Sequence, residues 1–276
     1  MQFETAIRAS QGARRSQEDT ALVWPAPAGG DAATLVPLLE AIDCVAAAVL
    51  CDGMGGHIGG AMASRLACEH FLPGLLAADG PVRNRLMVAL AMADNAITGK
   101  VRTAPAYKGM GATLVGVHLA TEGLWWVSVG DSLLYLWRKG ELQILNADHS
   151  LAPEIDKLAE SGKISWDEAA NDPRRHYLRA ALTGDEIEMI DLSEQPLPLE
   201  AGDVVILASD GIHTLEPGTM AALIAEFERS GAALIAMTLI AAVDAMRQPH
   251  QDNTTIVVIR VLDAALASGH RATGSR

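Results

Sequence analysis

The sequence is poor in cysteine and lacks both a long hydrophobic segment and a signal peptide. Cysteine occurs three times in 276 residues, at Cys44, Cys51 and Cys68, so the three cannot all pair with one another. This number argues against a disulfide scaffold and favours a reducing cytoplasm. The longest nearly apolar stretch, Ala232–Val243, is shorter than the roughly 18 residues that span a membrane, so it predicts a buried helix. Residues 1–10 lack the apolar core of a signal peptide, and we therefore expect a cytoplasmic location.

Positive charge is also scarce. The chain has 21 Lys and Arg against 34 Asp and Glu, which gives a formal net charge of −13. Its longest basic runs contain only two residues, Arg14-Arg15 and Arg174-Arg175. Proteins that bind nucleic acid use clusters of Lys and Arg to displace counterions. The composition therefore argues against a nucleic-acid partner, and we expect no membrane partner either.

Several common catalytic motifs are missing. A cysteine-based phosphatase needs Arg six positions after its cysteine, but Leu50, His57 and Gly74 occupy those positions. Neither the nucleotide-binding Gly-x-x-x-x-Gly-Lys-Ser/Thr loop nor the dinucleotide-binding Gly-x-Gly-x-x-Gly loop is present. The chain also lacks the paired histidines or cysteines that are typical of zinc hydrolases. These four classes of enzyme are therefore disfavoured.

The apolar content predicts one large folded unit. Half of the residues are hydrophobic, and neither a repeat nor a low-complexity linker divides the chain. We expect a single domain over residues 1–262, followed by a flexible tail over 263–276. Residues 151–182 are more polar and predict an excursion from the main fold.

Strand and helix patterns occur in blocks rather than in strict alternation, which favours an α+β fold with antiparallel sheets. We expect residues 3–9 and 20–24 to form a hairpin, and residues 111–145 to form an antiparallel meander. The remaining predicted strands cover 44–51, 187–192, 204–207 and 254–261, and the predicted helices cover 61–77, 82–97, 217–227 and 232–246.

Acidic residues recur where these strands begin or end. They are Glu18-Asp19, Asp52, Asp131, Asp210 and Asp252. A single such acid can simply terminate a strand by bonding its own backbone. Several carboxylates in one place, however, repel one another unless a cation holds them. Hard oxygen ligands suit Mg²⁺ or Mn²⁺, and Gly53, next to Asp52, would let a bare backbone carbonyl approach such an ion.

Seven short motifs in a fixed order give the sequence a recognisable pattern. They are Arg14-Arg15-Ser16-Gln17-Glu18-Asp19, Asp52-Gly53-Met54-Gly55-Gly56, Gly109-Met110-Gly111-Ala112-Thr113, Val129-Gly130-Asp131-Ser132, Ala147-Asp148-His149-Ser150, Ser209-Asp210-Gly211 and Asp252-Asn253-Thr254-Thr255. Over residues 3–262 this pattern resembles the metal-dependent serine/threonine protein phosphatases, the protein phosphatase 2C family, in their bacterial form. The resemblance implies a four-layer α-β-β-α sandwich, in which helices flank two antiparallel sheets. It also implies a flap-like insertion beside the active site over residues 151–182.

The resemblance also implies a centre of two Mg²⁺ or Mn²⁺ ions. In it, Asp52 would bridge both ions, the carbonyl of Gly53 would bind the first, and Asp210 and Asp252 would complete the second. Glu18 would hold a metal-bound water. Three further roles are implied by motif position: Asp19 would support the ligands, Asp131 would help to bind a third, weaker ion, and Arg14 would bind the phosphate.

These residues would support direct hydrolysis of a phosphate ester. Two divalent ions roughly 3.5–4 Å apart lower the pKa of a water, and the planar fork of Arg14 suits two phosphoryl oxygens. The leaving group needs a proton, which Met54, in the position of the usual histidine, cannot donate. A metal-bound water or another histidine must act instead. We expect His149 to organise a loop and His118, His176, His213 and His250 to be structural or exposed. His57 follows the Asp52 motif closely enough to lie near the site, but we expect it to be a residue near a helix start without a catalytic role.

The sequence therefore predicts a phosphatase that removes phosphate from serine and threonine in proteins, as a monomer that opposes a Ser/Thr kinase. The alternative is a non-catalytic, phosphatase-like sensor or scaffold. Such proteins commonly lose a metal ligand, whereas Asp52, Asp210 and Asp252 are all present here. Two interpretations of the flap arginines, Arg174, Arg175 and Arg179, stay open: they contact acidic or phosphorylated substrate, or they form a solvated basic surface.

Overall fold

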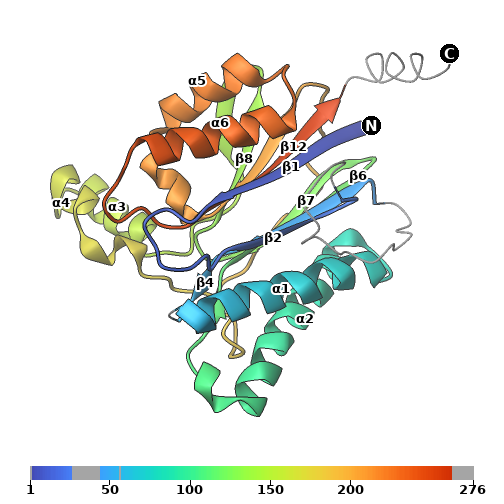
Figure 1. Cartoon of the computed structure of the whole chain (residues 1–276), viewed down its shortest axis with the longest axis vertical. Helices are drawn as coiled ribbons and strands as arrows, with labels where there is room; N and C mark the ends of the chain where they lie inside the picture. The colour runs from blue at the N-terminus through green and yellow to red at the C-terminus, as the bar shows by residue number, and fades with distance from the viewer. Residues whose placement is uncertain (1, 27–43, 56, 263–276) are drawn as a thin grey trace.

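The computed structural model describes residues 2–26, 44–55 and 57–262. It consists of two five-stranded antiparallel sheets that pack face to face, with a pair of helices outside each sheet (Figure 1). The predicted α+β sandwich is therefore confirmed. The predicted tail, residues 263–276, lies outside the described part of the chain.

The first sheet contains the two ends of the described chain side by side. Its strand order is β1 (Gln2–Ser10), β12 (Thr254–Leu262), β11 (Val204–Ala208), β8 (Leu133–Arg138) and β9 (Glu141–Ile144). Helices α5 (Pro217–Phe227) and α6 (Ala232–Ala245) cover its outer face (Figure 1). α6 includes the apolar stretch predicted as a buried helix.

The second sheet has the order β10 (Asp191–Leu192), β7 (Gly123–Val129), β6 (Leu114–Ala120), β3 (Ala46–Cys51) and β2 (Thr20–Trp24). Helices α1 (His57–Ala77) and α2 (Val82–Thr103) cover its outer face. A short ribbon of β4 (Gly53–Met54) and β5 (Gly111–Ala112) extends it, and the one-turn helix η1 (Pro105–Tyr107) follows α2.

Three apolar layers hold this sandwich together. One lies between the sheets, where Leu50, Leu134 and Val257 are fully buried, and one lies under each pair of helices. Because both faces of the central strands are covered, all six residues of β3 are buried. For the same reason these strands have continuous apolar sequences rather than alternating ones.

Two predicted strand pairings are wrong. Residues 20–24 do not form a hairpin with β1; β1 pairs with β12, and β2 pairs with β3 in the other sheet. Residues 111–145 form two hairpins, β6–β7 and β8–β9, because the chain crosses from one sheet to the other between β7 and β8. Alternation of residues along a strand does not specify its partner, so sequence reasoning could not detect the crossing. The predicted strand over 187–192 is also shorter, since only Asp191–Leu192 pairs with β7.

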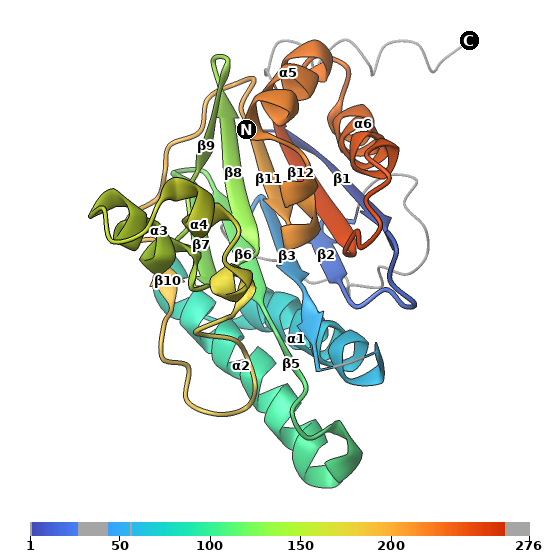
Figure 2. The same ribbon diagram turned by 90° about the vertical axis from the view of Figure 1, so that its left-hand side faces the viewer.

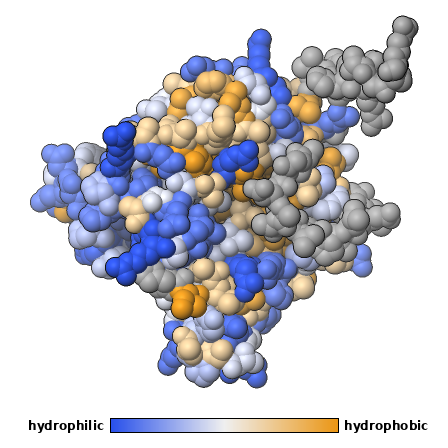
Figure 3. All heavy atoms as spheres, viewed as in Figure 1, coloured by the Kyte–Doolittle hydropathy of each residue, from blue (hydrophilic) through white to orange (hydrophobic). Residues whose placement is uncertain are grey.

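Residues 151–182 form a flap at one end of the sandwich (Figure 2). It contains α3 (Ala152–Glu160), α4 (Trp166–Ala170) and the one-turn helix η2 (Pro173–His176). A small cluster of Ile155, Ala159 and Ala169 holds the two α-helices together. Hydrophilic residues dominate its outer surface, on the left of Figure 3.

Candidate active site

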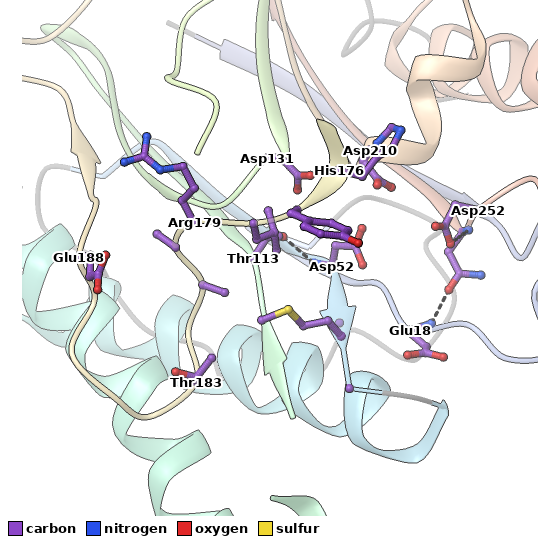
Figure 4. A pocket seen from close by; sticks show the side chains of 18 of the residues that line it. Glu18, Asp52, Thr113, Asp131, His176, Arg179, Thr183, Glu188, Asp210 and Asp252 are labelled. Carbon is purple, nitrogen blue, oxygen red and sulfur yellow. Dashed lines mark hydrogen bonds between the residues drawn. The ribbon is translucent and has the colours of Figure 1, made fainter. Parts of the chain in front are cut away.

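The antiparallel register brings the acidic strand ends to one edge of the sandwich. Thr20 in β2 pairs with Cys51 in β3, so the acids just before β2 and just after β3 are neighbours. Ala208 in β11 pairs with Ile256 in β12 and with Leu133 in β8, so three more acid-bearing ends meet beside them. Figure 4 shows the side chains of Glu18, Asp52, Asp131, Asp210 and Asp252 around one cavity.

This cavity has a volume of about 860 Å³. All the predicted site residues except Asp19 line it: Arg14, Glu18, Asp52, Gly53, Asp131, Asp210 and Asp252. Asp19 lies behind the cavity wall, 7% exposed, and its Oδ2 accepts a hydrogen bond from Ser209 Oγ at 2.8 Å. The sequence therefore predicted residues that the fold brings together.

Thr113 holds Asp52 in place. The backbone N–H of Asp52 donates to Thr113 Oγ1 at 3.0 Å, and the N–H of Thr113 donates to the carbonyl of Asp52 at 2.9 Å. Thr113 Oγ1 also lies 2.7 Å from the hydroxyl of Ser132, the residue that follows Asp131 in the chain. One buried threonine thus links the ends of β3, β6 and β8.

Asn253 plays the corresponding role on the opposite side of the cavity. Its Oδ1 accepts the backbone N–H of Glu18 at 2.8 Å (Figure 4), and its Nδ2 donates to the carbonyls of Gln11 at 2.8 Å and Ser16 at 3.0 Å. These bonds fix the loop that contains Arg14. The guanidinium of Arg14 forms an ion pair with Asp252. The Arg14 side chain is 57% exposed, so it is accessible to a phosphate.

Two glycines make room for Glu18. A Cβ at Gly60 would lie 2.1 Å from Glu18 Oε2 and 2.7 Å from the carbonyl oxygen of Gly53. A Cβ at Gly53 would in turn lie 2.1 Å from the carbonyl oxygen of Gly60. Any larger residue at Gly60 would therefore fill the space between the Glu18 carboxylate and the Gly53 carbonyl.

The electrostatics of the site favour a bound cation. Burial, followed by repulsion from Asp19 and Asp210, holds the pKa of Asp52 well above its usual range. Burial and Asp210 raise the pKa of Asp131 to about 7, and burial raises the pKa of Asp19 to about 6 against the opposing hydrogen bond from Ser209. Carboxylates that destabilise each other's charged forms in this way bind a divalent cation readily.

The donor atoms fit Mg²⁺ or Mn²⁺. Asp210 Oδ1 is buried and has no hydrogen-bond partner in the described part of the chain, which leaves its lone pairs for a ligand. The other donors are carboxylate and carbonyl oxygens, which are hard ligands. Among residues 2–26, 44–55 and 57–262, no three Asp, Glu, His or Cys side chains lie close enough together to coordinate one metal ion without further ligands. The acids instead surround an open cavity, with space for ions, water and a phosphoryl group.

Sequence reasoning did not identify all residues at this site. His176, expected to be structural or exposed, is indeed exposed, but it also lines the cavity from the flap and lies beside Asp131 and Asp210 in Figure 4. Thr113 and Asn253 belong to the quoted motifs and could have been found there, whereas Gly60 and His176 have no spacing signal. The expectation for His149 agrees with the structure: its Nδ1 accepts the backbone N–H of Gly130 at 3.2 Å. The side chain of His57 lies outside the described part.

The flap arginines are bound to carboxylates. Arg174 pairs with Asp172 at 2.6 Å, Arg175 with Asp156 at 2.5 Å, and Arg179 with Glu154 at 2.6 Å. These ion pairs lie within the flap itself. Of the two open interpretations, they favour a solvated surface over one prepared for acidic substrate.

No protein-family model matches the chain, but individual known proteins do. The chain is 34% identical over 223 residues to the serine/threonine protein phosphatase PstP of Mycobacterium tuberculosis, over 78% of this chain and 40% of that protein. It is 31% identical over 177 residues to the serine/threonine phosphatase stp of Listeria monocytogenes, over 62% of this chain and 68% of the relative. The chain thus spans well under half the length of the mycobacterial protein.

A solved structure agrees with these relatives. The catalytic domain of PstP, crystallised with two manganese ions, matches with a TM-score of 0.72 and 30% identity, over 95% of this chain and 99% of that domain. In addition, the Listeria relative is matched over more than two thirds of its length, and the same motif acids surround one cavity here. The chain belongs to the bacterial serine/threonine protein phosphatases of the protein phosphatase 2C type.

Proposed function

We propose that this chain removes phosphate from phosphoserine and phosphothreonine in proteins, with two Mn²⁺ or Mg²⁺ ions at the cavity. The observation that carries the proposal is the convergence of Asp52, Asp210 and Asp252 at one edge, with a buried oxygen of Asp210 left without a protein partner. Asp52, the Gly53 carbonyl, Asp210 and Asp252 would hold the two ions. Asp131 would help to hold a third.

Bound there, the ions would supply the Lewis acidity that makes a water nucleophilic near neutral pH and withdraws charge from the phosphoryl oxygens. Glu18, whose backbone Asn253 fixes, would orient that water through its carboxylate. Arg14 would exchange part of its contact with Asp252 for the phosphoryl group, because its fork has enough donors for both. Asp19 would keep its neighbours in place from behind the cavity.

The serine or threonine oxygen that leaves the phosphate needs a proton. Met54 cannot donate one, because a thioether has no acidic proton. Among the histidines whose side chains the structure describes, His176 is the one that lines the cavity, so it is the one best placed to reach a bound phosphoresidue. We also propose that the protein is a cytoplasmic monomer that opposes a Ser/Thr kinase. The three buried, unpaired cysteines support the reducing location.

A metal-dependence assay tests the proposal. We expect no hydrolysis of p-nitrophenyl phosphate or of phosphoserine and phosphothreonine peptides after dialysis against EDTA, and recovery when Mn²⁺ or Mg²⁺ is added back. Ca²⁺ is the matched control, because it prefers more ligands and longer bonds than the other two ions. Full activity in EDTA would contradict the metal mechanism, and no activity with any divalent ion would favour the sensor or scaffold alternative.

A further inference from the structure

One wall of the cavity is formed by residues 183–190, which connect the flap to β10. Glu186 and Glu188 from this segment line the same cavity as the metal-site acids. Figure 4 shows Glu188 on the opposite side of the cavity from Glu18 and Asp252. A peptide that places its phosphate at the acidic edge therefore passes close to this wall.

Residues 183–185 of this segment form a bend, and residues 186–190 continue from it with the burial pattern of a strand but without a strand partner among the described residues. Burial alternates along it: Ile187 and Met189 pack against the core beneath α1 and α2, while Glu186 and Glu188 are exposed. In the described part of the chain, the backbone N–H and C=O groups of residues 186–189 have no protein hydrogen-bond partner. An extended backbone with free donors and acceptors is a common docking edge for an extended peptide. This observation is independent of the charges on the segment.

The charges of the cavity rim differ from one side to the other. On the flap side, Arg179 lines the cavity and is already bound to the Glu154 carboxylate. On the side of residues 183–190, neither Glu186 nor Glu188 forms an ion pair with any described residue. The unpaired charges on this side of the cavity, those of Glu186 and Glu188, are therefore negative. They complement Lys or Arg in the part of a peptide that flanks its phosphoresidue.

We propose that Glu186 and Glu188 make this phosphatase select phosphoserine and phosphothreonine sites that are flanked by Lys or Arg. The substrate segment lies extended along residues 186–189 while its phosphate occupies the acidic edge. This inference rests on the proposed function, since it names the class of phosphoprotein that the same cavity accepts. Because both glutamates are exposed, the selectivity is modest and decreases with added salt.

Three phosphothreonine peptides test the selectivity. They are identical except that Lys, Gln or Glu occupies the positions two to five residues from the phosphothreonine on both sides. We expect kcat/KM to fall in the order Lys, Gln, Glu, with the Lys peptide about fivefold better than the Glu peptide at low salt, as two exposed charge pairs allow. A ratio near one for the wild-type enzyme would overturn the inference.

Substitutions then locate the selectivity. In the double variant Glu186→Gln and Glu188→Gln we expect the Lys-to-Glu ratio to fall to about one or two, because both charges that define it are gone. Asp185→Asn is the control: it removes one negative charge from an exposed neighbour that does not line the cavity, so we expect the ratio to stay at its wild-type value. An unchanged ratio in the double variant would overturn the inference. If wild-type enzyme with Mn²⁺ hydrolyses neither p-nitrophenyl phosphate nor any peptide, the proposed function itself fails, and this inference with it.

Discussion

Strand β11 has an aspartate near each end, and the two have opposite surroundings. Asp203, just before the strand, is 2% exposed and fully bonded: it accepts Arg138 Nε at 2.9 Å, Arg138 Nη2 at 2.5 Å and the N–H of Glu200 at 2.7 Å. Asp210, just after the strand, has a buried Oδ1 without a protein partner in the described chain. Burial and then Asp252 raise its pKa. Asp203 is thus neutralised by the guanidinium of Arg138, whereas Asp210 has an oxygen free to bind a metal ion.

In the sequence the two ends look alike. Both are acids next to glycine at the boundary of an apolar strand, Gly202-Asp203 and Asp210-Gly211. An acid at a strand end is therefore no evidence of function by itself. The distinction lies in the partners: a buried carboxylate with an arginine completes its own pairing, whereas unpaired carboxylates persist where a ligand completes them.

Asp210→Asn gives the largest expected effect. We expect kcat/KM for p-nitrophenyl phosphate with saturating Mn²⁺ to fall by about a thousandfold, because the amide contributes neither the charge nor the full donor capacity of a metal ligand. In EDTA, the free energy of unfolding should stay the same or rise by about 1 kcal/mol, because one of several mutually repelling buried acids is removed.

The combination of the two measurements is the informative result. Steady-state kinetics and urea unfolding of the same preparation separate a lost ligand from a lost fold. Retention of more than about a tenth of the activity, or a loss of stability like that expected below for Asp203, would contradict the assignment of Asp210.

Asp203→Asn should show the reverse behaviour. Removing one partner of a buried ion pair leaves the Arg138 guanidinium, 24% exposed, without its counter-charge. We expect the free energy of unfolding to fall by about 2–4 kcal/mol, at the lower end of what broken buried pairs cost because Arg138 can reach water. The kcat of the folded enzyme should change less than about twofold, since the pair lies at the other end of β11. A loss of kcat comparable to that of Asp210→Asn would show that the two ends are not separate in function.

Sequence reasoning succeeded where the signal is local and failed where it depends on distant packing. The apolar run of β3 and the acid that follows it are adjacent in the chain, so both the strand and the candidate ligand Asp52 could be predicted. The partner of β1 could not, because β12 lies at the other end of the chain. Gly60 and Glu188 are similar cases: their place at the cavity follows from how a helix and a connecting segment pack, and no motif marks them.

The smallest expected effect concerns pH and the acids that share the cavity. In metal-free protein the pKa of Asp131 is about 7, well above its ordinary value of 3.8, because of burial and then Asp210. The folded state therefore binds this proton more tightly than the unfolded state does. Its contribution to stability is full below about pH 4 and is lost as the pH rises towards 7.

Comparison with Asp131→Asn measures this contribution together with the effect of Asp131 on Asp52, whose raised pKa owes part of its shift to Asp131. The pKa values of His149 and His213 are lowered, and their titration changes stability in the opposite direction in both proteins. Between pH 5 and pH 7.5 in EDTA, we expect wild type to lose about 1–2 kcal/mol of unfolding free energy relative to the variant, measured by urea denaturation. With saturating Mn²⁺ the trend of wild type should reverse, because cations compete with protons for the same oxygens. Parallel pH profiles of the two proteins in EDTA would contradict the raised pKa of Asp131.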